Sequence, residues 1–294
     1  MSDSTSYEKG FDGKWLVSEY VYSPSGRFNG VVKQERLVEP LENGRLRVSQ
    51  KCEPDERLSD SPMEKFRGHH VFECEPDGHA RRYLGPSVLG TGLTWGEGAM
   101  TGRGIWPDFG HNFTSFAVVG EPGVQLTGGA FFNGREMIAN IAGIAHPQTD
   151  ENTPWPELSG PENPAELSLN WTGKVREVSP MGEVVSETPI ERRYDSTSSH
   201  RCFTEFVNEQ ECAQLTTEAN RQRLMVSGRI GTNTVHGLGK QYGWLIEFEL
   251  CLPNGTIVEW MEVLDSVRGR LVGIRRWWTD GILDRVEVVN LSPN

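Results

Sequence analysis

The chain has 294 residues, 36% of them hydrophobic, and includes nine Trp, twelve Phe and six Tyr. This apolar content is enough to fill a core and excludes a disordered chain, and the length suits one large domain or two of about 150 residues. The 29 Lys and Arg against 41 Asp and Glu give a net charge of −12, with no basic stripe. Phosphate backbones and anionic lipids would repel such a chain, so we expect neither nucleic acid nor a membrane surface as a partner.

The start of the chain is polar, and the cysteines are few and dispersed. No apolar run reaches the roughly 18 residues that a membrane-spanning helix needs, and no secretory signal is visible. The five cysteines include no Cys-x-x-Cys motif, which is typical of reduced thiols in a cytosolic protein. We therefore expect a cytoplasmic protein without a membrane span.

Alternation of apolar and polar residues predicts β-strands along most of the chain. In residues 44–52 the apolar side chains share one face with a basic face opposite, and residues 242–250 place Tyr242, Trp244 and Phe248 opposite two glutamates. Turns rich in Asn, Asp and Gly separate such segments at 42–44, 76–78 and 253–255. A segment rich in Glu, Gln, Ala and Leu predicts one helix over about 208–222. The predicted class is all-β and antiparallel.

Internal similarity predicts two tandem domains. Residues 146–166 are rich in Pro and acids and show no alternation, so we interpret them as a linker between domains at 1–145 and 167–294. Ser23-Pro24-x-Gly26 and Ser179-Pro180-x-Gly182 are separated by 156 residues, as are Glu35 and Glu191 with the Arg that follows each. Matches in the same order in both halves indicate an internal duplication.

About eight to ten short strands in each half, without crossover helices, predict a sandwich or a barrel. Closure into a barrel removes exposed edge strands, and a barrel of eight strands is wide enough to hold one small ligand.

Two motifs carry a resemblance to known barrels. Gly13-Lys14-Trp15 resembles the Gly-x-Trp opening of lipocalins, in which the Trp closes the barrel floor beneath an Arg. The resemblance implies that Arg135 fills this role in the first half, and either Arg276 or Arg285 in the second. The motifs Leu167-x-x-Asn170-Trp171-x-Gly173 and Ser179-Pro180-x-Gly182-Glu183, followed by Thr188-Pro189, resemble an uncharacterised lipocalin-like (calycin) family of cyanobacteria and plants. This resemblance implies tandem lipocalin-like barrels that bind a small molecule.

Glu262 is the first candidate for chemistry. Alternation over residues 256–264 places it on the face of Trp260, and if that face points inward, burial would raise its pKa toward the range of a general acid. On the following strand Arg276 and Trp278 share a face, which would place Arg276 opposite Glu262. The alternative is a structural ion pair near the barrel end.

Three further residues suit proton transfer. His70 shares a strand face with Phe66 and Phe72, either as a reactive group or as a hydrogen-bonded core histidine. Asp108 and His111 flank a turn through Pro107 and Gly110, which would let the carboxylate orient the imidazole. The alternative for Asp108 and His111 is a loop at the barrel mouth, in which the Asp caps backbone amides.

Aromatic residues are numerous enough to form the wall of a cavity. We expect six of them to bind the ligand: Trp95, Trp106, Tyr242, Trp244, Trp260 and Trp278. The chain contains no P-loop, no Gly-x-Ser-x-Gly elbow, no regular spacing of metal ligands and no His-x-His…Glu pattern of a bicupin. We therefore expect no metal and no cofactor.

These observations predict a hydrophobic small-molecule ligand or substrate enclosed in a barrel, such as a terpenoid, a polyketide or a tetrapyrrole-like compound. Polar residues on inward faces favour a cofactor-free cyclase, isomerase or lyase over a passive protein. The alternatives are a non-catalytic carrier or chaperone for a lipid or pigment, and a pair of barrels filled by their own side chains.

Overall fold

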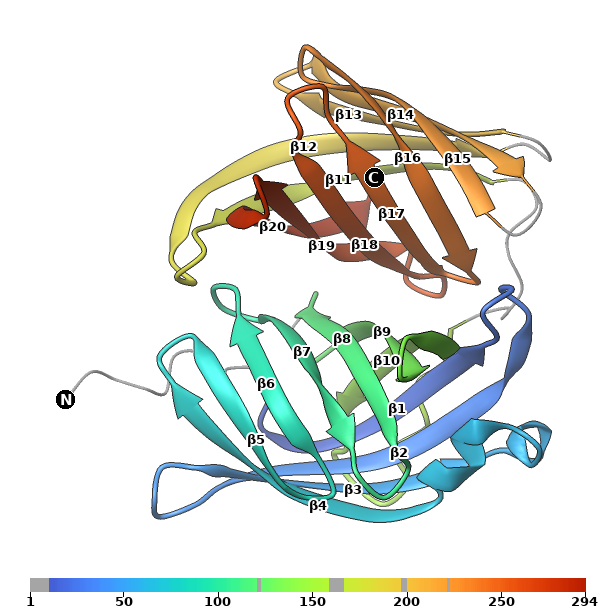
Figure 1. Ribbon diagram of the computed structural model, residues 1–294, viewed down its shortest axis with the longest axis vertical. Helices are drawn as coiled ribbons and strands as arrows, with labels where there is room; N and C mark the ends of the chain where they lie inside the picture. Colours follow the sequence, from blue (N-terminus) through green and yellow to red (C-terminus); the bar gives the residue numbers. More distant parts are fainter. Residues whose placement is uncertain (1–10, 121–122, 159–166, 197–199, 221–222) are drawn as a thin grey trace. The chain divides into compact units, whose positions relative to one another are not determined.

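The structure is a computed structural model that describes residues 11–120, 123–158, 167–196, 200–220 and 223–294. The chain divides into two units, Met1–Ser159 and Gly160–Asn294. In each unit the described strands form a closed antiparallel barrel of ten strands, each strand pairing with its neighbours in sequence and the last pairing with the first (Figure 1). The fold is all-β with two tandem lipocalin-like barrels, as the sequence predicted, although each barrel has ten strands where a lipocalin has eight.

The N-terminal barrel is drawn from blue to green in Figure 1. Its strands are β1 (Gly13–Tyr22), β2 (Phe28–Pro40), β3 (Leu46–Pro54), β4 (Gly68–Asp77), β5 (Ala80–Pro86), β6 (Leu89–Thr94), β7 (Ala99–Trp106), β8 (His111–Val119), β9 (Gln125–Asn133) and β10 (Glu136–Pro147). Two short 3₁₀ helices, η1 (Glu56–Leu58) and η2 (Pro62–Phe66), lie between β3 and β4. Their apolar side chains, Leu58, Met63 and Phe66, are buried in the core of this barrel.

The C-terminal barrel is drawn from yellow to red. Its strands are β11 (Leu167–Val178), β12 (Val184–Ser196), β13 (His200–Val207), β14 (Gln210–Asn220), β15 (Arg223–Ile230), β16 (Asn233–Tyr242), β17 (Leu245–Cys251), β18 (Ile257–Asp265), β19 (Arg270–Thr279) and β20 (Ile282–Pro293). Its core consists of the inward-facing apolar residues of these strands, among them Trp171, Tyr194 and Phe248.

The opening hairpins of the two barrels repeat the same local structure. The amide of Gly26 donates to the carbonyl of Ser23, and that of Gly182 donates to Ser179. Both glycines have positive φ, 87° and 83°, a conformation that costs glycine least. An irregularity in the register precedes each turn, at Val21/Tyr22 in one barrel and at Glu177/Val178 in the other. The duplication predicted from the 156-residue offset is thus present in the backbone.

The helix predicted over 208–222 is wrong. Asn208 and Glu209 form a turn with positive φ, and β14 follows it. Ala213, Leu215 and Thr217 are buried at every second position, so the period of this segment is that of a strand. Pairing with β13 and β15 outweighs the helical propensity of its Glu, Gln and Ala residues.

Part of the predicted linker belongs to the first unit. His146 and Pro147 end β10, and the amide of Leu158 donates to the hydroxyl of Tyr20 on β1 at 3.0 Å. Residues 159–166 of the predicted linker lie outside the described residues.

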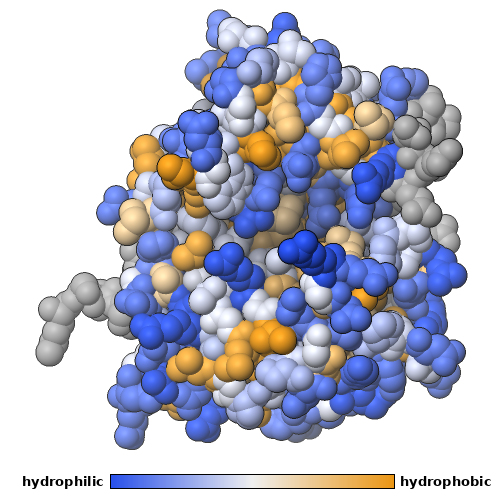
Figure 2. All heavy atoms as spheres, viewed as in Figure 1, coloured by the Kyte–Doolittle hydropathy of each residue, from blue (hydrophilic) through white to orange (hydrophobic). Residues whose placement is uncertain are grey.

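On the face of the molecule shown in Figure 2, the apolar patches are separate from one another. Across the described part of the chain, no helix is both long and apolar enough to cross a bilayer. All five cysteines are free thiols.

Candidate functional site

The interior of the N-terminal barrel contains a cavity of about 210 Å³. Inward-facing residues from most strands of the barrel line it, and its wall is mainly apolar, including Val48, Phe72, Met100, Trp106, Phe113 and Phe131. Glycines keep this interior open: Gly102 on β7 and Gly129 on β9 present no side chain to the space. The barrel therefore has room for a guest of small size.

Glu19 and Arg36 bring opposite charges into this cavity. Glu19 lies on β1 between the inward-facing Val17 and Val21, and Arg36 lies on β2 opposite Trp15, with its guanidinium 5.9 Å from the Trp15 ring. Among the described residues, Glu19 makes no hydrogen bond and no ion pair. Burial raises the pKa of Glu19 to about 7, and the positive charge of Arg36 only partly opposes this. Burial also lowers the pKa of Arg36 to about 10.

Several polar atoms around these two residues have no partner. Arg36 donates from Nη2 to Oε1 of Gln125 at 2.5 Å, but its Nε is buried without an acceptor. Gln50 donates to Oε1 of Gln34 at 3.3 Å, while its own Oε1 is unsatisfied, and so is Oγ1 of Thr127. Buried polar groups are normally hydrogen-bonded. The wall of the cavity therefore contains polar atoms that the described residues leave without a hydrogen bond.

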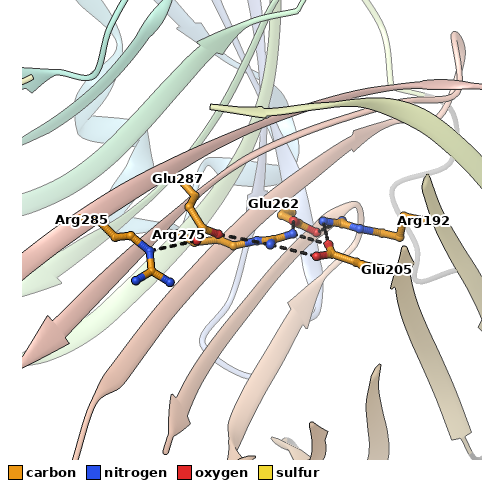
Figure 3. Close-up of polar contacts among 6 residues, drawn as sticks. All are labelled: Arg192, Glu205, Glu262, Arg275, Arg285 and Glu287. Atoms are coloured by element: carbon orange, nitrogen blue, oxygen red, sulfur yellow. Dashed lines mark hydrogen bonds and ion pairs between the residues drawn. The ribbon is translucent and has the colours of Figure 1, made fainter. Parts of the chain in front are cut away.

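The interior of the C-terminal barrel is different, because charged side chains fill its centre. Arg192 on β12 donates to Oε2 of Glu262 on β18 at 2.6 Å and also pairs with Glu205 on β13. Arg275 on β19 contacts Glu205 and lies 3.5 Å from Glu262 and 3.4 Å from Glu287 on β20. Figure 3 shows these side chains pointing toward one another, and Arg285 contacts Glu287 at the end of the row. Arg192, Glu205, Glu262 and Arg275 are buried and together neutral, whereas Arg285 is 32% exposed and also lies 3.6 Å from Asp284.

The network leaves little free space. The cavity between Trp171, Tyr194, Phe203 and Trp244 measures about 20 Å³, which is room for one water molecule at most. Burial alone would raise the pKa of Glu205, yet Arg192 and Arg275 together hold it at about 2. A carboxylate held in this way stays charged at every physiological pH. We interpret this interior as structural.

The two barrels can be compared position by position, because Trp15 pairs with Pro147 and Trp171 pairs with Pro293 at the same place in each ladder. Equivalent positions in the two barrels are found by counting along the paired strands from these two pairs. At these positions, large side chains fill the C-terminal barrel where small residues line the N-terminal one. The places of Phe248, Trp260, Glu262 and Arg275 are taken by Gly102, Ser115, Ala117 and Gly129, respectively. All four small residues line the cavity of the N-terminal barrel.

The predicted pairing of Glu262 with Arg276 is wrong. Glu262 and Trp260 face inward together, as predicted, and both are 1% exposed. Gly273 lies opposite Glu262 and Arg275 lies opposite Trp260, so the inward face of β19 carries Arg275 and Trp277. Arg276 and Trp278 face outward, where both contact Glu259. Alternation placed Arg276 and Trp278 on one face correctly, but apolar residues on both faces of this strand concealed which face is internal.

The histidines predicted for proton transfer lie near one end of the N-terminal barrel. Nε2 of His70 is 2.9 Å from the carbonyl oxygen of Phe66, and its ring packs edge-on against Trp106 and Phe109. This is the hydrogen-bonded core histidine of the alternative interpretation. His111 is buried with no hydrogen bond on either ring nitrogen, and Asp108 is exposed, so the predicted contact between them is absent. Burial and the charge of Lys65 lower the pKa of His111.

Of the six aromatic residues predicted to bind the ligand, Trp106 lines the large cavity. Trp95 is buried and donates to Oγ1 of Thr101 at 3.0 Å. Tyr242 is buried in the C-terminal barrel, and Trp244 borders its small cavity. Trp260 has the guanidinium of Arg275 over its ring at 3.6 Å. The role of these residues in binding stays a prediction.

The arginines implied by the lipocalin resemblance are not those found at the barrel-opening tryptophans. Arg36 lies over Trp15, whereas Arg135 is exposed in the β9–β10 turn. In the second barrel Arg192 is the residue opposite Trp171, and Arg285 lies over Trp277 instead. In both barrels the arginine therefore comes from the second strand and not from the barrel's end.

Sequence reasoning missed Glu19, Arg36 and Gln50. A signal was present for the first, because Glu19 is the one acid in the alternating segment Trp15, Val17, Glu19, Val21. The described residues contain no group of three or more His, Cys, Asp or Glu side chains that could hold a metal ion.

Comparisons with known proteins support the fold. A protein of unknown function of the DUF3598 family from Nostoc punctiforme is 12% identical, with both chains covered completely and a TM-score of 0.57. Transferrin-binding protein B from Haemophilus parasuis is 8% identical over 96% of this chain and 76% of its own, with a TM-score of 0.27. Kievitone hydratase from Nectria haematococca is 10% identical over 100% of this chain and 93% of its own, with a TM-score of 0.20. No family model matches the chain, and no curated protein matches it. The first likeness shows the tandem lipocalin-like fold, and the other two carry no argument.

Proposed function

We propose that the N-terminal barrel binds a small apolar or aromatic molecule in its interior. The observation that carries this proposal is the contrast between an interior cavity of about 210 Å³ in the first barrel and one of about 20 Å³ in the second. A space of about 420 Å³ in the second unit is bordered by the exposed residues Glu191, Arg193 and Asp195 and by the barrel-opening Trp171. A well-packed interior excludes voids larger than a water molecule, so an open one at this position suggests a binding space. In this proposal the C-terminal barrel, whose interior is filled, has a structural role.

The size of the cavity narrows the ligand class. A cavity of about 150 Å³ accommodates benzene, and drug-sized ligands occupy about 300–1,000 Å³. The volume found here supports a ligand of one or two rings, such as a small terpenoid or a short polyketide, and speaks against a tetrapyrrole. The apolar wall around Phe72, Phe113 and Phe131 favours a flat or hydrocarbon body.

Cofactor-free catalysis is the second candidate function, and a carrier for a lipid or pigment is its alternative. An enzyme would need a group that moves a proton, and the paired carboxylates of the C-terminal barrel do not suit this task. Glu19 favours the enzyme, since it faces the cavity without a partner. A cyclisation, an isomerisation or an elimination would each use such a group.

The binding proposal is tested with 2-tetralone, a bicyclic aromatic ketone, titrated into the full chain and followed by isothermal calorimetry. Ser115→Phe introduces a ring at the position of Trp260 in the other barrel, and we expect it to weaken binding at least tenfold. Asn112→Phe is the matched control, because this residue lies on the same strand and is exposed on its outer face. Equal affinity of both variants, or no binding by the unaltered protein, contradicts the proposal.

A further inference from the structure

The polar groups of the cavity carry an inference about its chemistry, which rests on the proposed function. We propose that Glu19 is a catalytic residue that transfers protons to and from a carbon atom beside the carbonyl group of a small apolar ketone or ester, with Arg36 holding the carbonyl oxygen. The substrate class follows from the three features of the cavity: an apolar wall for the body, a carboxyl group for the proton and a guanidinium for the oxygen.

Space around Glu19 allows a substrate to approach it. The residue directly opposite on β10 is Gly143, which leaves the area above the carboxyl group free of any side chain from that position. A Cβ atom on Gly143 would lie 3.4 Å from Cγ of Glu19 and would also collide with Oγ1 of Thr127. The absence of a side chain at Gly143 therefore leaves room for both Glu19 and Thr127 at this wall of the cavity. In the second barrel Val289 takes the place of Gly143, and Val175 takes the place of Glu19.

The charge state of Glu19 suits both directions of proton transfer. The pKa of about 7 means that the carboxylate base and the carboxylic acid are both populated at neutral pH. Arg36 forms no ion pair with Glu19, so the carboxylate is not neutralised as Glu205 and Glu262 are in the other barrel. The pKa is raised for Glu19 and lowered for Glu205, and such a difference between two internal carboxyl groups distinguishes a reactive acid from a structural one.

The proposed step is balanced without a co-reactant. The carboxylate of Glu19 takes the proton from the carbon beside the carbonyl, and the electron pair of that C–H bond forms a C=C bond as the carbonyl oxygen becomes negative. The guanidinium of Arg36, which lines the cavity, donates to this oxygen. Glu19 then returns the proton to the same carbon, which exchanges it, or to a conjugated carbon, which moves a double bond.

The test measures exchange of the α-hydrogens of 2-tetralone for deuterium in D₂O by NMR, with the full chain. We expect the protein to exceed an equal concentration of acetate, and the rate to rise with pH and level off above about 7 as Glu19 ionises. Glu19→Gln should lower the rate at least about 100-fold while leaving the Kd for 2-tetralone within a few-fold. Glu19→Asp, which keeps a carboxyl group, should restore part of the rate. Glu35→Gln is the matched control, because Glu35 lies on the outer face of the neighbouring strand and is exposed.

The outcomes separate this inference from the proposed function. Binding of 2-tetralone without exchange above the acetate rate overturns the role of Glu19 and leaves ligand binding intact. Exchange that survives Glu19→Gln, or that Glu35→Gln reduces equally, also overturns it. Absence of binding overturns the proposed function together with the inference.

Discussion

Removal of one charge from the centre of the C-terminal barrel should destabilise that barrel strongly. Glu262→Gln replaces a carboxylate that lies 2.6 Å from Arg192 and 3.5 Å from Arg275, with both arginines buried. The buried Arg192 and Arg275 would then share one buried carboxylate, Glu205, because Glu287 also pairs with the partly exposed Arg285. Breaking a buried ion pair from one side costs about 3–5 kcal/mol, because the partner charge remains desolvated.

A matched control lies on the same strand. Glu259 pairs with Arg276 at 3.0 Å on the outer face of the barrel, and the two side chains are 36% and 29% exposed. An exposed pair of this kind contributes about 0–1 kcal/mol. Glu259→Gln therefore makes the same chemical change three residues away from Glu262, where water can solvate the remaining charge.

Hydrogen exchange of backbone amides, followed by mass spectrometry, measures the effect for each barrel separately. Peptides from β18 and β19 of Glu262→Gln should exchange about 100- to 4,000-fold faster than in the unaltered chain, since each 1.4 kcal/mol of opening free energy is a factor of ten. Peptides from β1 and β2 should keep their rates. Comparable acceleration by Glu259→Gln and Glu262→Gln, or none by either, would refute the assignment of the internal network as a buried structural element.

Three further predictions concern titration and thiol reactivity. The pKa of Glu19 is raised to about 7, so the folded N-terminal barrel binds this proton more tightly than the unfolded chain and loses stability as pH rises from about 4.5 to 7. Glu19→Gln should therefore stabilise this barrel by up to about 3 kcal/mol at pH 8 and change its stability little at pH 4.5. Amide exchange in β1 measures both effects. The pKa of Glu205 is lowered to about 2, so this carboxylate contributes about 3 kcal/mol to the stability of the C-terminal barrel above about pH 4.5, and the contribution is lost as pH falls toward 2. Urea denaturation followed by amide exchange in β13 should show this loss, and a stability that does not change between pH 4.5 and 2 would contradict it. Burial raises the pKa of Cys52 to about 12, whereas Cys251 is exposed, so iodoacetamide mapping of the native protein should label Cys251 and spare Cys52 until the barrel unfolds.

Much of the fold could be predicted from local pattern. Period-two alternation and Asn-Gly or Asp-Gly turns depend on neighbouring residues, and they identified antiparallel strands without knowledge of their partners. The duplication was visible because the Ser-Pro-x-Gly turns and the Glu-Arg pairs kept one offset. The helix predicted over residues 208–222 is wrong because their composition favours a helix, whereas the burial of Ala213, Leu215 and Thr217 at every second position is that of a strand.

The candidate site was harder to predict, because it depends on register between strands distant in sequence. Val272, Ile274 and Trp278 on one face of β19 are as apolar as Leu271 and Trp277 on the other, so alternation could not choose Arg275 over Arg276. Glu19 has the same difficulty, since Leu16 and Tyr20 make the outer face of β1 apolar as well. Which barrel is hollow depends on four positions on β7, β8 and β9 that meet in space only after the barrel closes.

Arg36 and Arg192 occupy the same place in the two barrels, each opposite the tryptophan that opens its barrel. The residue across from Arg192 on β13 is Glu205, and the residue across from Arg36 on β3 is Gln50. A carboxylate at this position neutralises the arginine and fixes it in a closed network, whereas the amide of Gln50 leaves the charge in place and its own oxygen unsatisfied. Because an uncompensated buried charge is costly, the first arrangement stabilises a filled interior, whereas the second leaves Arg36 with a neutral amide partner, Gln125, beside the cavity. One duplicated arginine thus has a structural role in the C-terminal barrel, and in the N-terminal barrel it faces the space in which we propose that the guest binds.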